Sequence, residues 1–343
     1  DYLFWNSHTK SYNFKIVKEN NIIIAVHGYI PQSHFDSKLN KNEIFLGLVL
    51  AKKQIKFPLT PLTFSSIMNN DNYQFIGTIN PTLLPILKIK KFKIYKMAHS
   101  FIKNEKNKKI KNLKISKYEF LDQQKLKYLK TKKIYEGLIP KKSDNFLINR
   151  YLKHPQYKYS LVANLDLENN LKNILIFRII RNNKINLLRI VDYVGKEKDL
   201  VYCNALLNNL VNKFDFIDFY SHGISDEILK KTGFENIKDY KDLTIPNWFE
   251  PFVNKNIEIL CAYKMKSKTS VMLFRGDADQ DHPRKKMPWM QIWGINYWKT
   301  KIYLNFLNIL IKQLFLSKKT QKTSFSNLIF LLKLFNNFFI LKI

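Results

Sequence analysis

Four residues in the second half of the chain could move protons. Asp192 lies near the end of an apolar run, where desolvation by its neighbours would raise the pKa of its carboxylate and let it accept a proton from an ammonium group. His222 follows another apolar run and could act as a base or polarise a carbonyl group. Tyr193 and Tyr220 are candidate acids for a leaving thiolate. Plainer roles also fit: Asp192 could cap a turn, His222 could hydrogen-bond within its turn, and the tyrosines could simply pack.

A second group of residues is suited to contacting a substrate: Arg150, His154, Trp248, Glu250, Asp277, Asp279 and Asp281. Arg150 and His154 lie in a short segment that combines cations with aromatic residues. Glu250 lies between Trp248-Phe249 and Pro251-Phe252. Such a carboxylate suits stacking and hydrogen bonding to a sugar, but the same residues also make an ordinary corner of a core.

The three alternating carboxylates at 277–281 raise the question of calcium. An EF-hand loop needs Gly at its sixth position and Glu at its twelfth, where this chain has His282 and Pro288. Three alternatives remain: a divalent-metal site of another kind, an acidic wall for a cationic acceptor, and a turn whose carboxylates bond to their own backbone and to Arg275 or Arg284. We expect no bound metal.

A repeated unit would position several of these residues. Residues 73–92 and 215–234 each read as a short apolar strand, a polar turn and a helix that ends before a phenylalanine, with Leu87 and Leu229 at equivalent places. Aligned on the two phenylalanines, Asn80 falls opposite His222. The repeat indicates two similar α/β units, and 343 residues suffice for about two domains.

Apolar patterning predicts the remaining elements. In the first half we expect a hairpin at 14–17 and 22–29, a central strand at 43–51, a helix at 58–68 and a closing strand at 92–102. In the second half we expect strands at 157–165, 171–181 and 186–194, an amphipathic helix at 200–212, and a last hairpin at 257–265 and 269–274.

The chain has a net charge of +31, but this charge constrains the function only weakly. Such a charge favours nucleic acid or an anionic membrane as partners. Lys, Asn, Ile and Phe are abundant and Arg is scarce, however, as AT-rich codon usage would produce by itself. The densest basic run, 103–117, contains neither the Arg nor the stacking aromatic residues of nucleic-acid sites, so we expect a solvated linker there, with a phosphate- or membrane-facing patch as the alternative. Nucleic acid is not an expected partner.

Several motifs together resemble one family. They are GYIP at 28–31 with FLGLVL at 45–50, NRYLKHP at 149–155, LRIVDYVG at 188–195, IPNWFEPF at 245–252 and GDADQDHP at 276–283. In this order they are similar to the tandem GNAT-like proteins (acyl-CoA N-acyltransferase fold) of bacterial surface-polysaccharide clusters. The resemblance covers about residues 2 to 283. It implies two GNAT-like modules with mixed, mostly antiparallel sheets flanked by helices, acetyl-CoA as acyl donor, and a cytoplasmic role in glycan assembly.

The expected donor loop departs from this family. GNAT enzymes hold the CoA pyrophosphate on backbone N–H groups of a Gly-rich loop at a helix N-terminus. The first module has AKKQIKFPLTPL at 51–62, with no glycine and with two prolines that lack N–H groups. The second has only Gly195, so Val194, Gly195 and Lys196 are the candidate cofactor-binding residues. A degenerate first module is therefore expected.

We expect the chain to divide into a first module at residues 1–133, a second module at residues 134–283 and a tail at residues 284–343. The tail has apolar runs interrupted by Asn and Lys, which suit basic amphipathic helices on an anionic inner membrane leaflet better than spanning helices. Helices packed on the body and a read-through tail are the alternatives.

The chain begins with Asp1 rather than Met, so we expect an incomplete N-terminus. Cys203 and Cys261 lie in apolar contexts, so we expect buried free thiols in a reducing compartment.

The leading function is acyl transfer, with acetyl the expected group, to an amino sugar, a nucleotide sugar or a lipid-linked sugar acceptor, with Asp192 or His222 as the base. Two alternatives remain: a FemABX-like aminoacyl transferase that uses charged tRNA, and a non-catalytic subunit that binds a glycan or a carrier.

Overall fold

The computed structural model describes residues 4–6, 10–51, 74–79, 81–104, 116–129, 131–182, 185–245, 255–265, 270–277 and 281. All of them belong to one compact unit, Asp1–Arg284. The predicted helix at 58–68, nearly all of the basic run at 103–117 and the tail at 284–343 lie outside the described residues. Among the described residues, no helix is both long and apolar enough to span a membrane.

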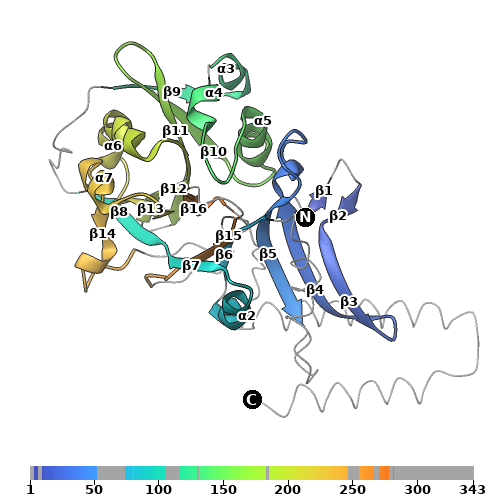
Figure 1. Cartoon of the computed structure of the whole chain (residues 1–343). Helices are drawn as coiled ribbons and strands as arrows, with labels where there is room; N and C mark the ends of the chain where they lie inside the picture. Colours follow the sequence, from blue (N-terminus) through green and yellow to red (C-terminus); the bar gives the residue numbers. More distant parts are fainter. Residues whose placement is uncertain are drawn as a thin grey trace, which may run out of the picture. The chain divides into compact units, whose positions relative to one another are not determined.

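The first sheet has six strands in the order β3-β4-β5-β6-β15-β7 (Figure 1). Their bounds are β3 Phe14–Glu19, β4 Ile22–Pro31, β5 Glu43–Ala51, β6 Gln74–Ile79, β15 Leu260–Lys264 and β7 Lys93–Lys96. Only β5 and β6 pair in parallel; the other neighbours are antiparallel. A separate pair of two-residue strands, β1 (Trp5–Asn6) and β2 (Ser11–Tyr12), precedes this sheet.

The second sheet has the same plan with one strand added at its edge. Its order is β14-β8-β13-β12-β11-β10-β9, and β16 pairs with β13 beside this path. The bounds are β8 Ala98–Lys103, β9 Lys117–Leu121, β10 Tyr159–Leu165, β11 Leu171–Asn182, β12 Ile185–Gly195, β13 Phe216–His222, β14 Glu235–Asn236 and β16 Leu273–Phe274. Here β12 and β13 are the parallel pair. The predicted fold class, α/β with mixed, mostly antiparallel sheets, is confirmed.

Short helices connect and cover these strands. They are α2 (Leu84–Ile89), α3 (Gln123–Tyr128), α4 (Lys132–Tyr135), α5 (Asp144–Leu147), α6 (Asn204–Val211) and α7 (Asp226–Lys231), with 3-10 turns at Gln32–His34, Pro81–Leu83, Glu197–Cys203 and Ile237–Asp239, and a π turn at Ile148–Leu152. In α6, Leu206, Leu207 and Leu210 follow the three-and-four spacing of an amphipathic helix and pack on the apolar face of β11 and β12. Ser225 caps α7 by accepting a hydrogen bond from the amide of Ile228.

The predicted repeat is confirmed as a pair of strand–turn–helix units. β6 and α2 lead to buried Phe92, and β13 and α7 lead to buried Phe234. Leu87 and Leu229, which the repeat placed opposite each other, are both buried.

The two halves of the chain exchange one strand each, which the sequence did not reveal. The segment 92–102 was predicted as one strand, but it forms β7 in the first sheet and β8 in the second. The predicted last hairpin was also wrong, because β15 pairs with β6 and β7 whereas β16 pairs with β13. Both errors have one physical cause: neighbouring apolar runs were assigned to the same sheet, while here the partners are distant in sequence. The domain boundary at residue 133 stays a prediction.

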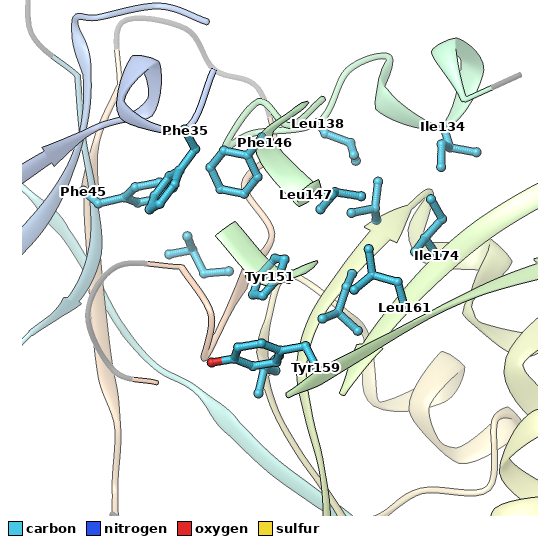
Figure 2. Packing of buried hydrophobic residues seen from close by; sticks show 14 of the residues in the cluster. Phe35, Phe45, Ile134, Leu138, Phe146, Leu147, Tyr151, Tyr159, Leu161 and Ile174 are labelled. Atoms are coloured by element: carbon cyan, nitrogen blue, oxygen red, sulfur yellow. The ribbon is translucent and has the colours of Figure 1, made fainter. Parts of the chain in front are cut away.

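A buried core joins the two halves. Figure 2 shows Phe35 and Phe45 of the first half beside Phe146 of the second. The rings of Phe35 and Phe146 meet edge to face, with centroids 5.2 Å apart. Each fully buried aromatic side chain of this kind contributes about 1.5–3 kcal/mol to folding, so the halves stabilise each other. The predicted buried free thiols, Cys203 and Cys261, are confirmed as such.

Candidate functional site

The strands of the second sheet part beside Asp192. Parallel pairing between β12 and β13 runs from Leu187 to Ile190 and then stops. On the other side of β12, Ile176 lies opposite Asp192 and Phe177 opposite Ile190, so Val191 is the extra residue of a β-bulge. A bulge bends its strand and redirects backbone groups. Asp192, the predicted base, therefore lies directly after the bulge, where β12 leaves β13.

Residues 273–277, which we call the strap, fill the space between the parted strands. Leu273 and Phe274 pair with His222 and Ser221 of β13. On the opposite side, the amide of Gly276 donates to the carbonyl oxygen of Val191. The Phe274 ring stacks on Phe219, with centroids 5.6 Å apart, and meets the Tyr193 ring at 5.9 Å. The strap thus fills the gap beside Asp192, which the sequence named as a candidate base.

A buried ionic cluster holds the strap in place. Lys142 forms an ion pair with Asp192 and a second one, at 3.1 Å, with Asp277 of the strap. The Tyr151 hydroxyl donates to Asp192 Oδ2 at 2.7 Å, and the Tyr193 amide donates to Asp192 Oδ1 at 2.8 Å. Asp192, Tyr151 and Asp277 are at most 1% exposed and Lys142 is 5% exposed. Both oxygens of the Asp192 carboxylate therefore have partners within the protein.

Burial controls the ionisation of this cluster. Desolvation raises the pKa of Asp277 to about 7, although Lys142 acts in the opposite direction. Burial alone would lower the pKa of Lys142, but attraction by Asp192 and Asp277 outweighs burial and raises it. Burial, helped by the charge of Asp192, raises the pKa of Tyr151 well above its usual value. Lys142 therefore stays charged, and Asp277 titrates near neutrality.

Of the four predicted catalytic residues, only His222 reaches the surface. Tyr193 is buried and donates to the carbonyl of Lys196 at 2.7 Å, and Tyr220 is buried and donates to the carbonyl of Ile257 at 2.9 Å. Burial raises the pKa of both tyrosines, which makes them weaker acids. His222 is half-buried, and desolvation lowers the pKa of its imidazole, so the ring is neutral at neutral pH.

His222 belongs to a cluster of three rings. Its ring centroid lies 4.4 Å from that of Tyr95 on β7 and 6.0 Å from that of Tyr263 on β15, and these two tyrosine rings stack on each other at 5.6 Å. Tyr263 lies opposite Ile76 of β6. A residue at the end of a second-sheet strand therefore contacts the first sheet.

The predicted cofactor-binding residues lie at the end of β12. Val194 and Gly195 are buried, and only Lys196 is exposed. The turn that follows carries Glu197 and Asp199 in its first positions. Glu197 accepts a hydrogen bond from the Ser225 amide at 2.8 Å. Carboxylates at a helix start compete with a phosphate for the same N–H groups and repel it.

The predicted substrate-binding residues that the structure describes are engaged within the protein. Arg150 is buried, donates to the carbonyl of Gly276 at 3.2 Å and lies over the Phe35 ring. His154 Nδ1 accepts hydrogen bonds from the amides of Gln156 and Tyr157. Asp277 binds Lys142 as described above. Trp248, Glu250 and Asp279 lie outside the described residues.

Asp281 closes a second ionic cluster next to the first. Arg178 donates to both of its carboxylate oxygens at 2.9–3.0 Å, and Tyr159 donates to Oδ2 at 2.6 Å. The Arg178 guanidinium also lies 4.1 Å from the Tyr157 ring centroid. Burial alone would raise the pKa of Asp281, but Arg178 outweighs it and holds the pKa well below its usual range. The acidic loop thus contacts the protein's own cations.

The sequence did not point to Lys142, Tyr151 or Arg178. Lys142 lies between Lys141 and the helix cap Ser143, and nothing local separates it from other lysines of this Lys-rich chain. Its partner Asp192 is 50 residues away. Tyr151 lies within the NRYLKHP motif, which was a usable signal, although only Arg150 and His154 of that motif were singled out.

The parallel strands of the first sheet also part. β5 pairs with β6 only from Glu43 to Phe45, and residues 46–51 continue along β4 alone. Among the residues that the structure describes, no strand pairs with this part of β5 on its β6 side. A Cβ at Gly47 would lie 2.8 Å from the carbonyl oxygen of Gly28, so glycine permits the close approach of β4 and β5 at their irregularity.

Comparisons with known proteins give similarity of structure only. No family model and no curated protein matches the chain. A conserved protein of Enterococcus faecalis V583, called a probable N-acyltransferase, is 8% identical with a TM-score of 0.47, over 73% of this chain and 61% of that one. A GCN5-related N-acetyltransferase of Anabaena variabilis is 9% identical with a TM-score of 0.47, over 73% and 62%. N-myristoyltransferase of Saccharomyces cerevisiae, solved with myristoyl-CoA, is 9% identical with a TM-score of 0.39, over 72% and 68%. The chain thus spans about three fifths of the first two structures.

Proposed function

We propose that the protein is an acyl-CoA-dependent acyltransferase whose donor binds in the first sheet, between β5 and β6. One observation carries this proposal. The two sheets share a strand order with one parallel pair that parts, and in the second sheet the chain's own strap fills the gap. Among the described residues, the corresponding edge of β5 at 46–51 has no such strand. Parted strands leave main-chain N–H groups that can bind a thioester carbonyl.

The second sheet then serves as a support. Its gap is filled, Asp192 is paired with Lys142, and the turn after Gly195 carries carboxylates. Displacing the strap would break the buried ion pair between Lys142 and Asp277 and the hydrogen bond between Gly276 and Val191. Donor binding in the second sheet is therefore costly. The sequence favoured the second module as the donor site, whereas this proposal assigns the donor to the first.

The reaction needs a base for the acceptor amine. Its nitrogen attacks the thioester carbon, the C–S bond breaks, and the amine proton passes to a base while CoA leaves as thiolate. His222 suits this role because its pKa is lowered and its ring is partly exposed. Tyr263, which it contacts, lies opposite Ile76, the last β6 residue paired with β5. Acetyl as the acyl group and an amino sugar of a surface polysaccharide as the acceptor rest on the motif resemblance alone.

A non-catalytic binding subunit is the second candidate, because the filled gap of the second sheet is the arrangement expected of a scaffold. Calorimetry with acetyl-CoA and with CoA separates the two functions, followed by a free-thiol assay in the presence of amino sugars. We expect micromolar binding and thiol release that depends on an acceptor. Absence of binding at millimolar CoA would overturn the acyltransferase proposal and favour the binding subunit.

A further inference from the structure

The edge of the first sheet exposes an unusual number of large apolar side chains. Five of those on the described surface lie within residues 5–23: Trp5 (41% exposed), Tyr12 (45%), Ile16 (46%), Ile22 (55%) and Ile23 (47%). Single exposed apolar residues are normal, but a contiguous group indicates an interaction surface.

Strand register places Ile16 and Ile23 on one face. Side chains alternate along β3, so Phe14, Ile16 and Lys18 share a face. Ile23 lies opposite Lys18 and therefore joins that face, whereas Ile22 lies opposite Glu19 on the other. β3 is the outermost strand of its sheet (Figure 1).

Ring contacts extend this face beyond β3. Tyr12 stacks on Phe14, with centroids 5.5 Å apart, and Trp5 meets Tyr12 edge to face at 4.9 Å. Ring contacts thus link Trp5, Tyr12 and Phe14, and strand register adds Ile16 and Ile23 on the face of Phe14. We call these five residues the apolar stripe.

Positive charges lie near the apolar stripe. Lys18 is exposed on the same face of β3 as the stripe, and Lys10 is exposed just before β2, whereas the exposed Lys15 lies on the other face of β3. Glu19 is the only acidic residue between positions 10 and 23. Trp and Tyr are the side chains that favour the level of lipid headgroups, isoleucine favours the acyl region, and lysine is attracted to anionic lipids. The whole chain, at +31, would be drawn to such a surface.

We propose that the apolar stripe docks the protein on an anionic membrane surface. The occupant is a lipid surface rather than a second copy, because two copies joined by this face would bring their lysines together. The proposal is independent of the acyltransferase proposal and of the membrane role expected for the tail, since it concerns residues 5–23 only.

Vesicle co-sedimentation of the full chain tests this. The vesicles are phosphatidylcholine alone or mixed with phosphatidylglycerol. The variant Ile16→Ser/Ile23→Ser is compared with Ile89→Ser/Leu167→Ser, a matched change at two other exposed positions, 77% and 56% exposed. Because all four side chains are exposed, both variants should fold, which circular dichroism checks.

We expect the wild type and the Ile89/Leu167 variant to sediment with the anionic vesicles, and the Ile16/Ile23 variant to bind at least about tenfold more weakly, the factor expected from losing two inserted side chains. Equal binding by all three proteins would overturn the proposal, since the tail or net charge would then suffice. A wild type that binds neither vesicle would also overturn it. So would a loss of self-association in the Ile16/Ile23 variant without a change in vesicle binding.

Discussion

The amide of Gly276 and the carbonyl oxygen of Val191 are joined by a 2.6 Å hydrogen bond. This bond ties the strap to the bulge of β12 at the point where β12 leaves β13. Its neighbours Phe274 and Asp277 add ring packing and an ion pair on either side. The second sheet is therefore completed by the chain's own strap at the point where β12 and β13 part.

Gly276→Ala should loosen the strap. A Cβ there would contact the Tyr151 hydroxyl and lie 2.9 Å from the Val191 carbonyl oxygen. We expect a loss of about 1–3 kcal/mol in the free energy of unfolding, measured by urea denaturation. The same change in a Tyr151→Phe background should cost less, because the contacting hydroxyl is gone. Equal costs in both backgrounds would show that Tyr151 does not confine this glycine.

Lys142→Met should destabilise the fold strongly. It leaves the buried carboxylates of Asp192 and Asp277 facing each other without a cation, which costs roughly 3–5 kcal/mol. The matched control is Lys125→Met, which breaks an exposed pair with Glu119 and should leave the unfolding midpoint nearly unchanged. Similar midpoints for the two variants would contradict the buried cluster.

Asp277→Asn should change how stability depends on pH. Burial raises the pKa of Asp277 from 3.8 in the unfolded chain to about 7 in the fold. The folded protein therefore holds this proton more tightly, and the wild type loses stability as pH rises from 3.8 to 7. The variant lacks this loss, so its stability relative to the wild type should improve by a few kcal/mol across that range. Chemical denaturation at a series of pH values measures the difference, and a constant difference would contradict the assignment.

His222→Gln tests the base of the proposed reaction. Because desolvation lowers the pKa of His222 below 6.5, kcat/KM should fall only as pH drops below that value. The variant should lose this acid limb and about 10²–10⁴ in rate. His154→Gln is the control: His154 accepts two backbone amides, so its loss should reduce stability but keep the acid limb. An unchanged profile in the His222 variant would remove it from catalysis.

The sequence predicted those structural elements that depend on residues close together in the chain. The strand–turn–helix repeat ending at Phe92 and Phe234 was visible because each unit is contiguous and spaced alike. The strand that carries Asp192 was also visible, because its mostly apolar run at 186–194 is contiguous. Partners distant in sequence were not: β8 and β15 change sheets, and Lys142 reaches Asp192 across 50 residues. A residue pattern indicates which face is buried but not which distant strand covers it.

Hydrogen exchange with and without acetyl-CoA tests the donor site most directly. We predict that acetyl-CoA slows exchange of the amides at 46–51 on β5 and leaves those at 190–195 on β12 unchanged. Protection at 190–195 together with faster exchange at 273–277 would contradict this account, because the donor would then have displaced the strap and entered the second sheet.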